Sequence, residues 1–130
     1  MSRGKVVKRL DTVFSEYIRL RNADNNGNVT CFTCGKVGYW KGKGMQCGHF
    51  QSRKHYSTRW DETNCQVQCS ACNVFRYGEQ YKFALNLDKE FGMGTAEELL
   101  IKANEVVKIS TKELESLITY YKNQIELLNK

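Results

Sequence analysis

The segment from Cys47 to Asn73, CGHFQSRKHYSTRWDETNCQVQCSACN, carries most of the information about the fold of this chain. It contains both histidines of the chain and four of its six cysteines. His49 stands within it, close to two Cys-x-x-Cys pairs, one inside the segment and one before it. A histidine in this setting can be a zinc ligand, a buried structural residue or the base of a catalytic site.

The two Cys-x-x-Cys pairs predict one structural zinc site, formed by Cys31, Cys34, Cys69 and Cys72. Zinc prefers four tetrahedral ligands, and two such pairs supply four thiolates. In a reducing compartment, clustered cysteines are more often metal ligands than disulfides. Cys47 and Cys65 lack a partner at this spacing, and the sequence assigns them no role beyond that of buried or free thiols.

A different zinc site would use the histidines. The first cysteine pair followed by His49 and His55 resembles a stretched Cys2His2 finger, whose central spacing is usually about 12 residues. This interpretation leaves the second cysteine pair without a role, so we favour the four-cysteine site. A zinc deaminase is excluded, because its His-x-Glu motif needs a glutamate at Gln51 and its Pro-Cys-x-x-Cys motif needs a proline, which the chain lacks.

The spacing of His49, Asn64 and Asn73 predicts a nuclease site. Fourteen residues separate the first two, eight separate the last two, and Asn73 directly follows a Cys-x-x-Cys pair. This pattern is typical of HNH nucleases. The chain therefore resembles the ββα-metal endonucleases, in which a hairpin carries the histidine and the following helix carries the last ligand. We expect an α+β fold, with a zinc-bound ββα-metal (HNH-like) core, an N-terminal helix and a C-terminal helical extension.

Four short motifs are similar to a single family. They are CFTCGK at 31–36, GHFQSR at 48–53, TRWDETN at 58–64 and QCSACN at 68–73. Over roughly residues 8–92 the chain resembles the phage recombination family NinG, also called Rap. The resemblance implies a structure-specific DNA endonuclease that cuts branched intermediates such as Holliday junctions and D-loops. The alternatives are a sequence-reading HNH nuclease of the restriction or homing type and a non-catalytic zinc DNA-binding protein.

The HNH resemblance implies roles for the site residues. His49 is the candidate general base, because a neutral imidazole with a pKa near 6.5 can take a proton from water at physiological pH. Asn64 would hold His49 in place, and Asn73 would offer its amide oxygen to a catalytic Mg²⁺ or Mn²⁺. Many HNH enzymes have a metal ligand directly before the histidine, where this chain has Gly48. The candidates for the missing carboxylate are Asp61 and Glu79.

Basic residues are concentrated around this predicted site. Residues 1–92 hold 15 Lys and Arg against 8 Asp and Glu, whereas residues 93–130 hold 5 against 6. A positive surface around a candidate active site favours nucleic acid as the partner. We expect Arg76 to share a helix face with Asn73. The expected contacts to branched double-stranded DNA are Arg53, Lys54, Arg59 and Arg76.

Hydrophobic periodicity predicts a helix near the N-terminus, with the apolar stripe Leu10, Val13, Phe14, Tyr17 and Ile18. Residues 37–40 and 45–50 read as two short strands of a hairpin, joined by a glycine-containing turn. Another strand is expected at 65–69. A further helix should start near Asn73, carry Phe75, Tyr81, Leu85 and Phe91, and stop at Gly92.

Residues 93–130 are predicted to form a helical extension of the nuclease core in 1–92. Capping boxes at Thr95–Glu98 and Ser110–Glu113 begin its two helices. The second helix has an apolar stripe, Leu114, Leu117, Ile118, Tyr121, Ile125 and Leu128, which either packs inside the chain or forms the seam of a homodimer. The sequence has no signal-peptide pattern and no apolar run of about 18 residues, so we expect no membrane partner and a cytoplasmic location, that of the host cell for a phage protein.

Overall fold

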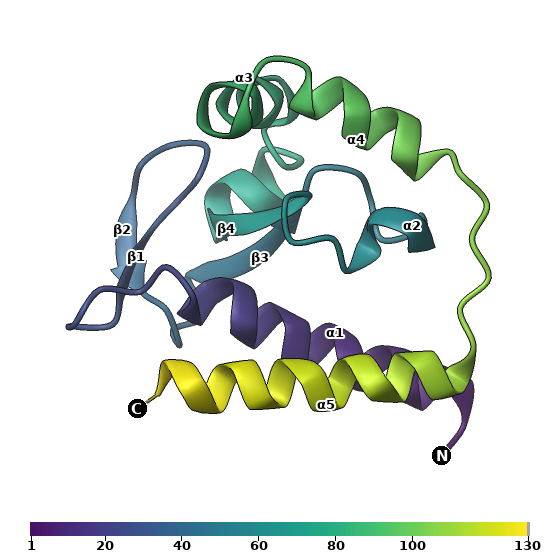
Figure 1. Ribbon diagram of the computed structural model, residues 1–130. Helices are drawn as coiled ribbons and strands as arrows, with labels where there is room; N and C mark the ends of the chain where they lie inside the picture. Colours follow the sequence, from purple (N-terminus) through teal and green to yellow (C-terminus); the bar gives the residue numbers. More distant parts are fainter. Residues whose placement is uncertain (130) are drawn as a thin grey trace.

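The first layer of the fold consists of two helices, α1 (Arg3–Leu20) and α5 (Thr111–Leu128), which lie side by side and run in the same direction in the computed structural model (Figure 1). The structure describes residues 1–129. A hydrogen bond from Arg3 to the Thr111 hydroxyl, at 3.4 Å, joins the two N-terminal ends. The predicted stripe of α1 faces the core, because Leu10, Phe14 and Ile18 are almost completely buried.

The apolar stripe of α5 packs inside the chain. Leu114, Ile118, Tyr121 and Ile125 are buried against α1 and its neighbours, Leu117 is partly buried, and of the stripe only Leu128 at the end of the helix is exposed. The Tyr121 ring meets Phe14 edge to face, with the ring centroids 4.9 Å apart. Of the two interpretations of this stripe, intramolecular packing is therefore the one observed. The capping box at Ser110 and Glu113 is confirmed.

The middle layer contains two separate hairpins. Strand β1 (Asn28–Thr30) pairs with β2 (Val37–Tyr39), and β3 (Met45–His49) pairs with β4 (Cys65–Cys69), both antiparallel. The predicted hairpin of 37–40 with 45–50 is therefore wrong. The first Cys-x-x-Cys loop reverses the chain between β1 and β2, so β2 pairs with the strand before it and β3 pairs with the strand predicted at 65–69.

The segment after β4 departs from the predicted long helix. It begins with a short π-helical turn, η1 (Ala71–Phe75), and the regular helix α3 (Gln80–Phe91) starts later. Tyr77, Gly78 and Glu79 between them all have positive φ, a conformation that a continuous right-handed helix cannot contain. As a result α3 buries Phe83 and Leu87, whereas the side chains predicted for this helix, Phe75, Tyr81, Leu85 and Phe91, are exposed.

The third layer is formed by α3 and α4 (Thr95–Ala103), which cover the hairpin of β3 and β4 on the side away from α1 (Figure 1). Gly94 caps α4 with a positive φ, so the capping box predicted at Thr95 is wrong. Helix α2 (Tyr56–Arg59) interrupts the loop between β3 and β4. Lys102 of α4 pairs with Asp61 of that loop, which ties the C-terminal extension to the hairpin. Within residues 1–129, no helix is long and apolar enough to span a membrane.

Candidate active site and metal centre

The four cysteines predicted as zinc ligands meet at one end of the β3–β4 hairpin. Their sulfur atoms all lie within 4.8 Å of one another, and Cys34 and Cys69 are 3.6 Å apart. Four thiolates around a zinc ion at about 2.3 Å would be about 3.8 Å apart, so the observed cluster fits the ion with small side-chain movements. These residues, Cys31, Cys34, Cys69 and Cys72, can therefore hold a metal such as zinc.

The surroundings of these sulfurs shift the pKa values of Cys31 and Cys34 in opposite directions. Burial raises the pKa of Cys31, but hydrogen bonds from the Thr33 hydroxyl and from backbone N–H groups outweigh it and lower the pKa to about 6. At Cys34, a backbone hydrogen bond at Lys36 lowers the pKa, but burial and the three neighbouring sulfurs raise it to about 12. Four sulfurs at this separation cannot all ionise without a cation between them, which agrees with a metal-binding role.

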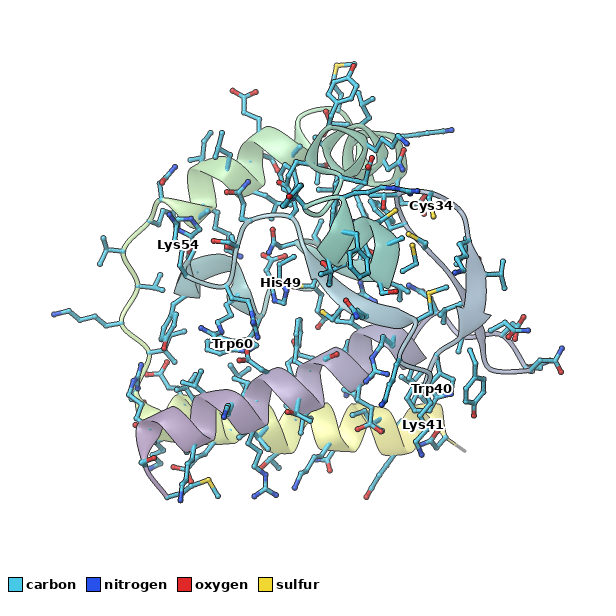
Figure 2. The ribbon with its side chains drawn as sticks, turned by 180° about the vertical axis from the view of Figure 1, so that it is seen from behind. Cys34, Trp40, Lys41, His49, Lys54 and Trp60 are labelled. Carbon is cyan, nitrogen blue, oxygen red and sulfur yellow. The ribbon has the colours of Figure 1, made fainter. Side chains whose placement is uncertain are left out.

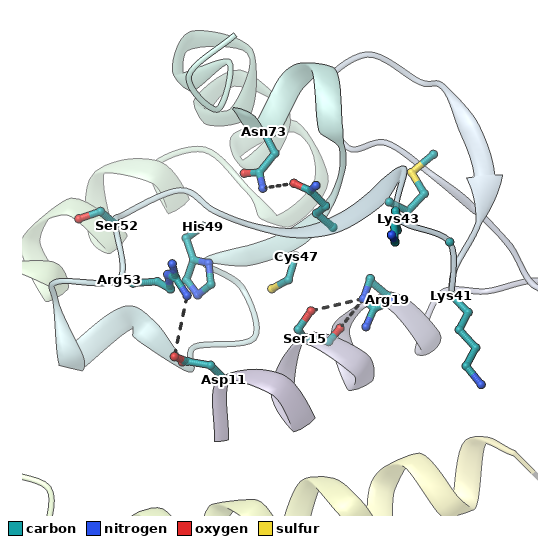
Figure 3. A pocket seen from close by; sticks show the side chains of 13 residues that line it. Asp11, Ser15, Arg19, Lys41, Lys43, Cys47, His49, Ser52, Arg53 and Asn73 are labelled. Atoms are coloured by element: carbon teal, nitrogen blue, oxygen red, sulfur yellow. Dashed lines mark hydrogen bonds and ion pairs between the residues drawn. The ribbon is translucent and has the colours of Figure 1, made fainter. Parts of the chain in front are cut away.

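A cleft of about 850 Å³ runs along β3, between this strand, α1 and the turn before β3. Figure 3 shows its lining, with Asn73 on one side of β3 and with Cys47 and Asp11 on the side toward α1. Two of the three predicted HNH residues, His49 and Asn73, line this cleft. The structure thus brings together residues that are 24 positions apart in the sequence.

His49 is the last residue of β3 and lies near the centre of the molecule (Figure 2). Its Nε2 is 2.9 Å from the carbonyl oxygen of Arg59. A carbonyl oxygen only accepts, so Nε2 carries the proton and the lone pair of the neutral ring is on Nδ1. Burial lowers the pKa of His49, and the positive charge of Arg53 lowers it further, although the contact with Arg59 opposes them. The imidazole is therefore neutral at physiological pH.

Asn64 is fully buried and connects the two ends of the loop between β3 and β4. Its Oδ1 accepts from the backbone N–H of Gln51 at 2.8 Å, and its Nδ2 donates to the carbonyl oxygens of Gln51 and Thr58 at 3.1 and 3.0 Å. These bonds fix the backbone two residues beyond His49. Asn64 lies outside the cleft lining, and its contacts are those of a positioning residue.

Asn73 lies in η1 and faces the same cleft from the opposite side of β3. Its Nδ2 donates to Gln46 Oε1 at 2.8 Å, as Figure 3 shows. This bond fixes the amide orientation. Among residues 1–129 no donor contacts the Asn73 amide oxygen, which is therefore available to a hard cation.

The two carboxylates considered as further metal ligands lie elsewhere. Asp61 accepts from the backbone N–H groups of Thr63 and Asn64 and pairs with Lys102. Glu79 pairs with Lys82 at 3.5 Å. The carboxylate that does line the cleft is Asp11 of α1, which sequence reasoning missed because α1 was interpreted only as a packing helix.

Asp11 is held by the loop between β3 and β4. Arg59 donates to both of its oxygens, at 3.0 and 2.6 Å, and the indole N–H of Trp60 donates at 3.0 Å. The guanidinium of Arg59 also donates to the carbonyl oxygen of Arg53 at 3.0 Å. Arg59, expected to contact DNA, is thus occupied in joining α1 to this loop.

The other basic residues expected at the site divide in the same way. Arg53 lines the cleft with an exposed side chain, whereas Lys54 (labelled in Figure 2) lies outside it. Arg76 donates to Cys72 Sγ at 3.8 Å. Because η1 ends at Phe75, Arg76 does not continue a helix face from Asn73 as expected. Three cleft cations were missed, Arg19, Lys41 and Lys43. The two lysines flank Gly42 in a turn that the sequence suggested only as a strand connection.

Gly48 is next to His49 and faces Gln68 of β4. A Cβ atom at this position would lie 1.9 Å from Gln68 Oε1, so no side chain fits while Gln68 keeps its place. Gln68 is itself fixed, because its amide nitrogen, Nε2, donates to Thr33 Oγ1 and to the carbonyl oxygen of Gly78. Its Oε1 is buried with no hydrogen-bond partner among the described residues. Gln68 therefore occupies the space that the side chain of a metal ligand at position 48 would need.

The comparisons with known proteins identify one family. A family model described as Bacteriophage Lambda NinG protein matches residues 1–130. The match extends the resemblance, noted above for roughly residues 8–92, to the whole chain. Searches of curated proteins and of solved structures found no match.

Proposed function

Because the chain belongs to the NinG family, which is related to phage recombination, we propose that it is a metal-dependent endonuclease of the HNH type that cuts branched DNA. The observation that carries the proposal is the meeting of His49 and Asn73 at one cleft with a cationic lining. The order of β3, loop, β4 and η1 supports a ββα-metal core around it.

The proposed chemistry is hydrolysis of a phosphodiester, which needs an activated water and neutralisation of the phosphate charge. His49 takes the proton of the water at Nδ1, and the bond from Nε2 to Arg59 fixes the ring and stabilises the imidazolium that forms. Asn64 fixes the loop that leaves His49. Asn73 would hold Mg²⁺ or Mn²⁺ through its amide oxygen, and the ion would supply charge neutralisation at the phosphate. The products are 5′-phosphate and 3′-hydroxyl ends.

The cationic lining of the cleft provides the proposed DNA contacts. Arg53, Lys41 and Lys43 are exposed side chains at its rim, and Arg19 lies deeper against the carbonyl oxygen of Trp40 at 2.7 Å. Basic side chains at this density bind phosphates of either strand without reading the sequence. This favours a structure-specific over a sequence-reading nuclease.

The test compares three substrates of matched sequence: a four-way junction, a D-loop and a linear duplex, each with and without Mg²⁺. We expect cleavage of the branched substrates in the presence of Mg²⁺ and little cleavage of the duplex. Cleavage of the duplex at one fixed sequence would favour a restriction or homing type of nuclease. Binding of all substrates without cleavage would favour a non-catalytic zinc protein.

Resolving a four-way junction takes two symmetric cuts, and we propose that two copies of the chain provide them. Four residues of the α5 stripe, Leu114, Ile118, Tyr121 and Ile125, are buried in the core of their own chain, so we propose that the contact lies on another surface. Light scattering with and without junction DNA tests the stoichiometry. A monomer mass under both conditions would contradict the dimer.

A further inference from the structure

A second group of metal-binding side chains lies toward the end of the hairpin away from the four cysteines. It consists of Cys47, His49 and Cys65, whose ligand atoms all lie within 4.8 Å of one another. None of the three belongs to the four-cysteine site, and the proposed hydrolysis uses only His49.

The register of the hairpin explains why these residues meet. His49 of β3 is directly opposite Cys65 of β4, and Cys47 is opposite Val67. Residues opposite each other in an antiparallel pair share a face, as do residues two apart on one strand. All three side chains therefore project from the face of the hairpin that packs toward α1, where Cys65 is part of the buried core.

We propose that Cys47, His49 and Cys65 form a second metal site, selective for Zn²⁺ and other thiophilic cations, and that its occupation blocks the base. Two thiolates and an imidazole suit zinc, whereas Mg²⁺ prefers oxygen ligands. Ideal zinc geometry places such ligand atoms about 3.6–3.8 Å apart, and the three atoms, all within 4.8 Å of one another, need only small side-chain movements to reach it. Three protein ligands leave the fourth position to a water from the cleft.

The hydrogen bond of His49 fits this role. Metal-binding histidines usually donate their other ring N–H to a carbonyl or carboxylate, which orients the ring. Here Nε2 donates to the carbonyl oxygen of Arg59, which leaves Nδ1 for the cation. The same lone pair would take the proton in hydrolysis. Metal binding and base catalysis therefore exclude each other, a consequence that rests on the proposed function.

Access to the site is from the cleft. Cys47 lines the cleft together with His49, while Cys65 lies beneath them and is fully buried. Binding releases the thiol protons of Cys47 and Cys65 to solvent and changes no oxidation state. Around the Cys65 sulfur lie the Asn64 amide, which donates to it at 3.9 Å, and the carbonyl oxygen of Arg59 at 3.6 Å. Neither group carries a positive charge, so a bound cation would balance the two thiolates in this buried position.

The test counts bound ions and does not depend on cleavage. The full chain is loaded with ¹¹³Cd²⁺, and its NMR spectrum and cadmium content are measured. We expect two cadmium ions per chain, with one resonance typical of four thiolates and one at higher field, typical of fewer thiolates. A single ion and a single resonance in the wild-type chain would overturn the proposal, with no variant needed.

Variants assign the second ion. Cys47→Ala and His49→Ala should each lose the high-field resonance and keep the four-thiolate one, whereas Ser52→Ala, at another position of the cleft, should keep both. Retention of both resonances in Cys47→Ala would also overturn the proposal.

Added Zn²⁺ should stop cleavage of a junction in excess Mg²⁺, and a chelator should restore it. Cleavage that continues with two ions bound per chain would contradict the block. Two ions bound to a chain that never cleaves DNA would instead refute the proposed function and leave the second site standing.

Discussion

The two ends of the β3–β4 hairpin carry two different sets of metal-binding side chains. At one end, Cys69 joins three other cysteines into a closed set of four, of which three are buried. At the other end, His49 and Cys65 are paired and join Cys47 into an open set of three beside the cleft. A closed set of four ligands holds an ion for structural purposes, whereas an open set leaves room for water or substrate. The comparison separates a closed set that can hold a metal such as zinc from an open set that faces the cleft.

The largest effect, a loss of stability, is expected when two of the four cysteines of the closed set are replaced. Cys34→Ser combined with Cys72→Ser removes two of four ligands, and structural zinc in small domains contributes about 10–16 kcal/mol of apparent binding energy to folding. We expect loss of the cooperative thermal transition, measured by circular dichroism. Cys47→Ala is the matched control from the open set and should retain a cooperative transition. An unshifted thermal transition in the double variant would show that the four-cysteine set does not stabilise the fold.

The next largest effect is a loss of cleavage rate, expected when His49 of the open set is replaced. His49→Ala should slow junction cleavage by about 10²- to 10⁴-fold, the usual contribution of a general base, with junction affinity nearly unchanged. His55→Ala is the matched control, since the other histidine of the chain lies outside the cleft. Cleavage rates under single-turnover conditions and binding isotherms provide the measurement. Equal losses of affinity and rate would indicate a structural role for His49.

A smaller effect, a moderate loss of stability, is expected at Asn64, which connects the two ends of the loop between β3 and β4. Asn64→Ala leaves the N–H and C=O of Gln51 and the carbonyl oxygen of Thr58 without their partner, and we expect destabilisation of about 3 kcal/mol. Urea denaturation measures it, with Asn104→Ala, an exposed asparagine of α4's end, as control. A destabilisation as small as that of the control would show that the open end does not depend on this contact.

The smallest effect is expected at the rim of the cleft. Arg53→Ala should weaken junction binding several-fold and reduce the slope of log K against log salt by about 1, as for one lost phosphate contact. Lys54→Ala, its neighbour outside the cleft, should change neither quantity as much. Fluorescence anisotropy at several salt concentrations gives both values. An equal effect of the two variants would indicate that the cleft is not the DNA-binding surface.

The closed end was predictable from the sequence because its information is local. A Cys-x-x-Cys spacing is a property of four consecutive residues, and two such pairs need only one another to complete a site. The stripe of α1 was predictable for the same reason, since Leu10, Phe14 and Ile18 repeat with the period of a helix.

The open end could be predicted only in part, because its geometry depends on strand pairing and on a broken helix. No local pattern indicates that Cys65 lies opposite His49, and the plausible pairing of 37–40 with 45–50 was wrong. Three successive residues with positive φ end η1 early, although two of them, Tyr77 and Glu79, rarely adopt that conformation. Asp11 of α1 is held beside the cleft by its bonds to Arg59, which is far from it in the sequence, so no local pattern indicates this contact.

The contact between Gly48 and Gln68 also restricts how this sequence can evolve. An acidic residue at position 48 would give the cleft a carboxylate next to His49, but its Cβ would collide with Gln68. Replacing Gln68 first by a smaller residue would remove the amide that joins Thr33, beside the first cysteine pair, to the carbonyl oxygen of Gly78. The change at position 48 therefore costs a collision, and the change at position 68 costs two buried hydrogen bonds whether or not position 48 changes too. This double constraint favours retention of Gly-His in any lineage that starts from this chain.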